Sequence, residues 1–251
     1  MISVPSLPNP RLPYCEVVRR LRSLRGGRLE QIAVASGYPL FIWQTRPGRP
    51  GHRVFISAGI HGNEPAGVEC VFQLLDRMPR WMRPFNLTIF PCLNPWGYEH
   101  NRRENEAGFD LNRQWRQACC VEIDAAKRIL RGRHFDLSLH LHEDYDAGGF
   151  YLYEISRDGG RFGRTILDAV SRILPVEQRT RIEGRRAQRG LVTRHPDHIR
   201  RRKRWPEALY HANHHSARSL TAETPTHQPI ERRVRAHTET LRVALQMLRS
   251  G

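Results

Sequence analysis

Apolar residues along this chain switch between two spacings, and the switch predicts the order of its structural elements. Segments with apolar residues three or four positions apart predict helices, and short apolar runs bounded by glycine or proline predict strands. The predicted helices are 13–24, 66–78, 121–130, 162–174 and 230–248, and the predicted strands are 29–36, 40–45, 53–60, 85–92, 135–142, 150–155 and 219–223. This alternation indicates an α/β fold, in which a twisted, mostly parallel sheet has helices on both faces.

The length of the chain, 251 residues, suits one domain with a large buried core. We therefore expect a single domain over 1–251, with an N-terminal helical extension over 1–28. No apolar run approaches the roughly 18 residues that cross a bilayer, and residues 1–13 lack the layout of a secretory signal. The five cysteines are odd in number and lack CxxC spacing, which favours reduced thiols. We expect a cytoplasmic protein with no membrane partner.

Positive charge is the most unusual feature of the composition. The formal net charge of +16 would by itself suggest nucleic acid, an anionic membrane surface or an acidic substrate as partner. Arginine supplies nearly all of it, since only Lys127 and Lys203 are lysines, and the arginines are spread along the chain. The densest stretch, Arg179 to Arg204, has little aromatic interleaving, so a solvated face explains it better than a nucleic-acid groove. No nucleic-acid partner is expected.

A histidine and a carboxylate lie three residues apart directly after the predicted strand 53–60. They are the two ends of the segment His61-Gly62-Asn63-Glu64. Open α/β sheets place their ligand sites at the carboxyl ends of strands, and at this spacing an imidazole nitrogen and a carboxylate can converge on one metal ion. Ordinary loop hydrogen bonds are the alternative explanation for so short a motif.

A catalytic zinc ion needs three protein ligands and an open position, so a third ligand is expected at the end of another strand. The predicted strand 135–142 carries His140 and His142 on one face and leucines on the other, because side chains alternate along a strand. His142 is nearer the strand end and is the predicted ligand. His140 is expected to orient a neighbouring group. A satisfied polar residue near a sheet end is the alternative for either.

An acid and two arginines supply the other groups that such a reaction needs. Glu223 ends the predicted strand 219–223 just before a proline and is the candidate base, although a plain surface acid is the alternative. Arg103 and Arg113 follow in the glycine- and asparagine-rich loop 94–112 and its end. One arginine can grip a carboxylate and a second can meet an oxyanion, so the pair suits an anionic substrate.

Taken together and in this order, several segments resemble the zinc carboxypeptidase superfamily over residues 53 to 240. These segments are His61-Gly-Asn-Glu-Pro-Ala-Gly67, Asn94-Pro-Trp-Gly97, Arg103-Glu-Asn105, Gly108-Phe-Asp-Leu-Asn-Arg113, Leu141-His-Glu-Asp144 with Phe150-Tyr-Leu-Tyr-Glu154, and Glu223-Thr-Pro225. The resemblance implies a mixed α/β sheet and one Zn²⁺ per chain, bound by His61, Glu64 and His142. It also implies that Arg103 steadies the oxyanion, that Asn112 and Arg113 hold a substrate carboxylate, and that Glu223 is general base and then acid.

The activity implied by the resemblance is that of a metallocarboxypeptidase, which hydrolyses an amide bond next to a free carboxylate. The superfamily's carboxypeptidases carry a mobile tyrosine upstream of the catalytic glutamate, but the nearest candidate, Tyr210, is close to Glu223 in sequence. The compact chain without a propeptide looks more like the bacterial branch that includes murein peptide amidases and the succinylglutamate desuccinylase and aspartoacylase group. An N-acyl amino acid deacylase is therefore the alternative, and a small peptide or acyl-amino-acid substrate is the expected partner.

Overall fold

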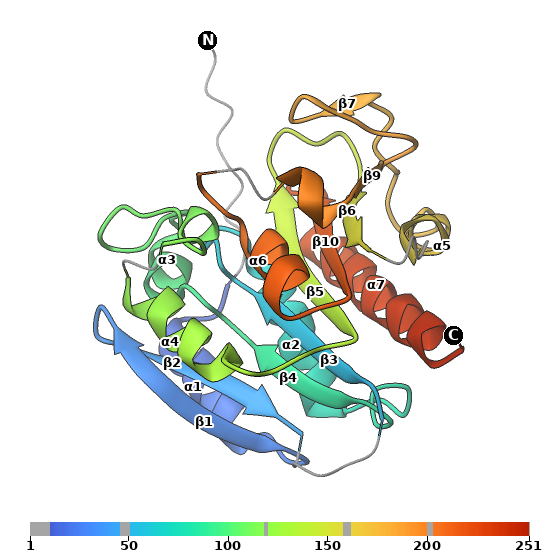
Figure 1. Cartoon of the computed structure of the whole chain (residues 1–251). Coiled ribbons are helices and arrows are strands. Elements are labelled where there is room, and N and C mark those ends of the chain that lie inside the picture. Colours follow the sequence, from blue (N-terminus) through green and yellow to red (C-terminus); the bar gives the residue numbers. More distant parts are fainter. Residues whose placement is uncertain (1–10, 46–50, 118–119, 158–161, 200–202, 251) are drawn as a thin grey trace.

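One eight-stranded sheet organises the computed structural model, which describes residues 11–45, 51–117, 120–157, 162–199 and 203–250 (Figure 1). In order across the sheet, the strands are β1 (Arg28–Ala35), β2 (Tyr38–Gln44), β4 (Asn86–Phe90), β3 (Arg53–Ala58), β5 (Leu137–Asp144), β10 (Arg218–Pro225), β6 (Tyr151–Ser156) and β9 (Leu191–Arg194). Four of the neighbouring pairs are parallel, namely β4 with β3, β3 with β5, β5 with β10 and β6 with β9, and the other three are antiparallel. The predicted α/β class with a mixed, mostly parallel sheet is confirmed.

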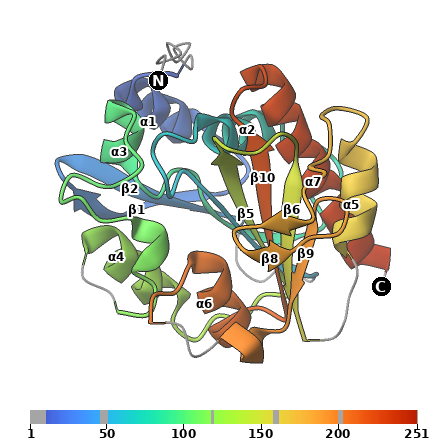
Figure 2. The same ribbon diagram turned by 90° about the horizontal axis from the view of Figure 1, so that it is seen from above.

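Helices cover both faces of this sheet, as predicted (Figure 2). Helices α2 (Pro65–Arg77), α5 (Phe162–Val170) and α7 (Ile230–Ser250) lie on one face, and α4 (Val121–Leu130) and α6 (Glu207–His214) lie on the other. Helices α1 (Tyr14–Ser23) and α3 (Pro95–His100) pack near β2, next to the edge strand β1. No helix in these described ranges combines the length and the apolar character needed to cross a membrane.

The central strand β5 shows how the sequence fixes the two faces. Leu137, Leu139 and Leu141 are 0–1% exposed and join the apolar core on the face that α2 and α7 cover. The residues between them point the other way, and the ring of His140 packs against Phe55. The predicted separation is confirmed, because the leucines and the histidines of β5 lie on opposite faces of the sheet.

Several elements lie in the predicted loop 94–112 or in the segment 178–219, to which the sequence pattern assigned no element. Helix α3 falls inside the loop, and the 3₁₀ turn Leu111–Arg113 lies at its end. The segment 178–219 contains α6, β9, the 3₁₀ turn Pro196–Ile199 and the small hairpin of β7 (Arg181–Ile182) and β8 (Arg185–Arg186). Helix α3 forms because Asn94 accepts a hydrogen bond from the Gly97 N–H, 2.9 Å away, and Pro95 occupies the first helical position. These elements are short, so they lack the repeated apolar pattern that reveals longer ones.

Three of the described cysteines agree with the prediction of reduced thiols. Cys15, Cys70 and Cys92 are free within the part of the chain that the structure describes, and Cys119 lies outside the described residues. Of the Arg-rich stretch, residues 200–202 also lie outside them.

Truncation of the leucine layer tests this packing. We expect Leu139→Ala to lower the free energy of unfolding by about 2–5 kcal/mol, because it leaves a cavity in the centre of β5. Urea-induced unfolding measures the loss. Val34→Ala is the control, since Val34 is 53% exposed and should lose less than about 1 kcal/mol. Equal losses in the two variants would contradict the assigned core.

Candidate active site

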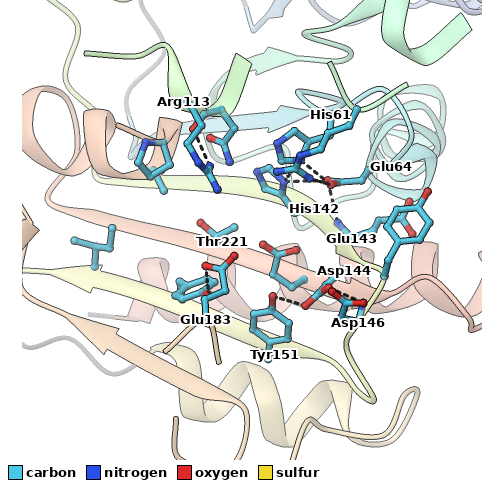
Figure 3. A pocket seen from close by; sticks show the side chains of 18 of the residues that line it. His61, Glu64, Arg113, His142, Glu143, Asp144, Asp146, Tyr151, Glu183 and Thr221 are labelled. Atoms are coloured by element: carbon cyan, nitrogen blue, oxygen red, sulfur yellow. Dashed lines mark hydrogen bonds and ion pairs between the residues drawn. The ribbon is translucent and has the colours of Figure 1, made fainter. Parts of the chain in front are cut away.

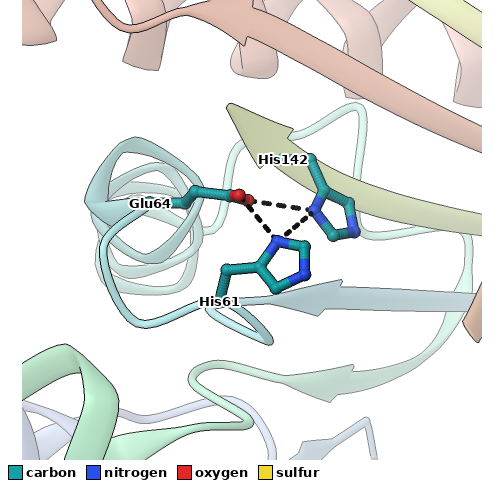
Figure 4. A group of neighbouring side chains, drawn as sticks. All are labelled: His61, Glu64 and His142. Carbon is teal, nitrogen blue, oxygen red and sulfur yellow. Dashed lines mark hydrogen bonds and ion pairs between the residues drawn. The ribbon is translucent and has the colours of Figure 1, made fainter. Parts of the chain in front are cut away.

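Three buried side chains meet at the carboxyl ends of β3 and β5 (Figure 4). His61 Nδ1 lies 2.6 Å from Glu64 Oε1, and His142 Nδ1 lies 2.9 Å from Glu64 Oε2. The two Nδ1 atoms are 3.2 Å apart, and none of the three residues is more than 3% exposed. Two imidazoles and a carboxylate that point their donor atoms at one place form a set that can hold a metal ion.

Local backbone structure explains why His61 and Glu64 converge. Strand β3 ends at Ala58, and Glu64 directly precedes Pro65 at the first position of α2. The turn between them packs so closely on α3 that a Cβ on Gly62 would collide with the backbone of Gly97. The glycine therefore allows the close approach that fixes the turn.

The main chain of Glu143 donates a further hydrogen bond to the Glu64 carboxylate. The Glu143 N–H donates to Glu64 Oε2 at 3.1 Å, and its own carboxylate accepts from the Ala66 N–H at 2.7 Å. The same carboxylate forms a buried ion pair with Arg233 of α7. Burial nevertheless raises the pKa of Glu143 to about 7. Strand β5, helix α2 and helix α7 are thus tied together beside the group of three.

Asp110 and Arg103 form a second layer around His61. Asp110 Oδ1 lies 3.3 Å from His61 Nε2, and Asp110 Oδ2 accepts from Arg103 Nη2 at 3.1 Å. Arg103 Nη1 also reaches Glu64 Oε1 at 3.5 Å. Burial alone would raise the pKa of Asp110, but the hydrogen bond to His61 and the charge of Arg103 hold it below its usual value. A carboxylate in this position fixes the ring so that Nδ1 faces inward.

A cavity of about 370 Å³ opens from these residues along the sheet (Figure 3). All seven of the predicted site residues line it: His61, Glu64, Arg103, Asn112, Arg113, His142 and Glu223. Glu223 reaches it because β10 pairs with β5 so that Glu223 lies beside His142. Tyr151, Glu183 and Thr221 lie across from Arg113 (Figure 3), and Tyr153 also lines the cavity.

Glu223 lies in an environment that disfavours its ionised form. Burial raises the pKa of Glu223 well above its usual value, and the nearby carboxylates of Glu64, Asp144 and Glu183 raise it further. Arg103 acts in the opposite direction. A carboxyl group whose pKa is raised above its usual value takes up a proton more readily than an ordinary glutamate does.

Two residues considered from the sequence lie elsewhere. His140 does not orient a member of the group of three; it lies in a separate buried network with Ser57, Glu207 and Ser219. Tyr210 lies on α6, where its ring packs against Trp115 and His214, and it is not among the described residues that line the cavity.

Several residues of the site were missed from the sequence. Asp110 could have been recognised from its local sequence, because aspartate often accepts a hydrogen bond from the N–H two residues later in a turn. Here the Asp110 side chain accepts from the Asn112 N–H at 2.9 Å. Glu183 had none, because it comes from the unpredicted hairpin β7–β8 and meets Tyr153, whose hydroxyl donates to Glu183 Oε2 at 2.9 Å. Arg233 likewise reaches Glu143 from α7, which is distant in sequence.

Solved structures described as metallopeptidases and carboxypeptidases share this fold. A candidate metallopeptidase from Shewanella amazonensis matches with a TM-score of 0.79 and 22% identity, over 94% of this chain and 91% of that one. A metallo-carboxypeptidase from Burkholderia cenocepacia matches with a TM-score of 0.71 and 18% identity, over 94% and 68% of the two chains. Carboxypeptidase A from Helicoverpa armigera matches with a TM-score of 0.69 and 14% identity, over 96% and 74%. The chain thus has a metallocarboxypeptidase-like fold.

Within this class, a sequence match points to one branch. The family model of the succinylglutamate desuccinylase/aspartoacylase catalytic domain matches residues 50–147. The predicted resemblance to the zinc carboxypeptidase superfamily, including this branch, is confirmed. The matched region contains His61, Glu64 and His142 but ends before Glu223. Comparison with curated protein sequences gave no match.

The second layer can be tested through metal affinity. We expect Asp110→Asn to weaken Zn²⁺ binding by about 10–100-fold, because the substitution removes the charge that orients His61. Competition with a chelator of known affinity measures the change.

Asp168→Asn, on the exposed surface of α5, is the matched control and should bind Zn²⁺ like the unaltered protein. Unchanged affinity in Asp110→Asn would show that the contact with His61 does not support metal binding.

Proposed function

We propose that this chain is a zinc-dependent hydrolase of the metallocarboxypeptidase type, which cleaves an amide or peptide bond next to a free carboxylate. The observation that carries the proposal is that His61, Glu64 and His142 converge at one end of a cavity that Glu223 and Arg113 also line. In this proposal residues 1–251 act as one catalytic domain.

The donor set fits zinc. Two imidazole nitrogens and a carboxylate are ligands that Zn²⁺ accepts in catalytic sites, where a fourth position stays open. His61 Nδ1 and His142 Nδ1 face each other at 3.2 Å, an arrangement that a shared cation explains better than a hydrogen bond between two rings of like type. Bound there, Zn²⁺ would polarise the scissile carbonyl and lower the pKa of a water molecule to about 7.

The other residues of the cavity take complementary roles. Glu223 accepts the proton of the attacking water and then delivers it to the leaving amine, which its raised pKa favours. Arg103 stands beside Glu64 and would steady the developing oxyanion. Asn112 and Arg113 donate hydrogen bonds to the substrate carboxylate.

A second candidate function uses the same chemistry on another substrate. The match of residues 50–147 to the succinylglutamate desuccinylase/aspartoacylase catalytic domain favours an N-acyl amino acid deacylase. Such a substrate also has a free carboxylate, so Arg113 would keep its role. The two functions differ in the acyl group attached to the nitrogen of the amino acid that is released: a peptidyl group in the first and an acetyl or succinyl group in the second.

Replacement of the proposed base separates catalysis from metal binding. We expect Glu223→Gln to lower kcat by about 10²–10⁴-fold while the Zn²⁺ content stays near one per chain, because the amide cannot accept the proton. Steady-state kinetics and metal analysis measure the two effects. Near-normal turnover by Glu223→Gln would refute the role of Glu223, and Zn²⁺ content unaffected by His61→Ala would refute the metal site.

Paired substrates distinguish the two candidate functions. Zinc-loaded protein is assayed with peptides that have a free C-terminal carboxylate and, separately, with N-acetyl and N-succinyl amino acids. We expect the peptides to be hydrolysed and the reaction to stop when a chelator removes the metal. Turnover confined to the acyl amino acids would replace the first function by the second.

A further inference from the structure

A second polar cluster lies behind the cavity, sealed between the sheet and α6. The Ser57 hydroxyl donates to Glu207 Oε2 at 2.7 Å, and His140 Nδ1 lies 3.0 Å from the same oxygen. His140 Nε2 is 3.2 Å from Ser219 Oγ. A serine, a histidine and a carboxylate in contact could suggest a second hydrolytic site, but these four residues are only 0–2% exposed. No substrate can reach them, so the cluster needs another explanation.

Burial of the Glu207 carboxyl group costs solvation free energy, and the packing of α6 does not by itself require a carboxyl group at this position. A carboxyl group removed from water loses several kcal/mol of solvation unless its oxygens find partners. Within the described part of the chain, Glu207 Oε1 has no hydrogen-bond partner. An apolar residue at this position would avoid the cost, which suggests that the contacts of the other oxygen with Ser57 and His140 serve a purpose.

The main chain of Glu207 connects the cluster to the candidate active site. Glu207 is the first residue of α6, and its N–H donates to Asn112 Oδ1 at 2.8 Å. Because the donor is an N–H, the acceptor must be the amide oxygen of Asn112. This bond leaves the Nδ2 group of Asn112 as the donor for the cavity, which Asn112 lines next to Arg113. Pro206 and Ala208, on either side of Glu207, also line the cavity.

We propose that Glu207 is a positioning residue for the substrate carboxylate and that it acts through Asn112. Its side chain anchors the start of α6 to β3 and β5, and its N–H holds the Asn112 amide with the donor group toward the substrate. The cluster of Ser57 and His140 provides the anchor. This inference rests on the proposed function, in which Asn112 and Arg113 bind a free carboxylate.

Kinetics of single and double variants test the proposal. We expect Glu207→Ala to raise KM for a benzoylglycyl amino acid about tenfold, with kcat within twofold and Zn²⁺ content unchanged. Glu207→Gln, which keeps the shape and one oxygen, should recover most of the affinity. Asn112→Ala should raise KM similarly, and the double variant should be no worse than Asn112→Ala alone, because coupled residues are not additive. Additive effects, or a loss confined to kcat, would overturn the proposal.

Glu154 provides a matched control for a purely structural effect. It is another buried carboxylate, 3% exposed, and it holds the start of a helix by accepting from the Phe162 N–H at 2.9 Å. The helix it holds, α5, does not contribute to the described lining of the cavity. Glu154→Ala should therefore lose stability but keep KM. If Glu207→Ala does not fold, Ser57→Ala removes one anchor of Glu207 and should raise KM in the same direction by a smaller factor.

A measurement without turnover separates this inference from the proposed function. Amide hydrogen exchange of residues 207–209 should become faster in Asn112→Ala, and the side-chain amide signals of Asn112 should shift and broaden in Glu207→Ala but not in Glu154→Ala. If these changes occur and no substrate is hydrolysed, the proposed function fails while the positioning contact stands. If substrates are hydrolysed and neither the spectra nor KM responds to Glu207→Ala, the inference fails alone.

Discussion

The functional site depends on the register of β5 against its two parallel neighbours. His140 pairs with Ser57 of β3, and His142 pairs with Glu223 of β10. Since side chains alternate along a strand, this register puts His142 and Glu223 on the same face at the same end of the sheet. A slip of β10 by one residue would turn Glu223 into the leucine layer under α2 and α7. The burial of apolar residues on one face therefore also fixes the polar geometry on the other.

Burial is the second constraint, because it makes each polar group around His61, Glu64 and His142 depend on its hydrogen-bond and ionic partners. Burial alone would raise the pKa of Glu64, but the adjacent His61 and His142 keep it below its usual value. Burial raises the pKa of Glu223, and the nearby carboxylates of Glu64, Asp144 and Glu183 outweigh the opposing charge of Arg103. The pKa values of two glutamates that line one cavity are thus shifted in opposite directions by their neighbours.

Sequence could predict the parts of this molecule whose signals are local and repeated. Strand 135–142 and helix 121–130 have regular apolar spacing, so these elements of the fold could be predicted from short-range patterns. The predicted ligands His61 and Glu64 are only three residues apart, so this pair too had a local signal. The hairpin that carries Glu183 could not be predicted, because each of its strands has two residues and its turn is defined by positive φ angles of 46° at Glu183 and 72° at Gly184. The contact of Asn112 with Glu207 spans 95 residues and has no local signal.

Net charge proved to be a poor guide to the site, for a physical reason. The chain carries a formal charge of +16, yet among the described residues that line the cavity six carboxylates face three guanidinium groups. The described part of the Arg-rich stretch includes β7, β8 and β9. The turn between β7 and β8 contributes Glu183 to the cavity wall and β9 contributes Arg194, while Arg181 and Arg186 are exposed. Charges in bulk water are screened within about 8–10 Å, whereas those in a cavity are screened much less. The few charged groups inside the cavity therefore determine its electrostatic potential more strongly than the many exposed arginines outside it do.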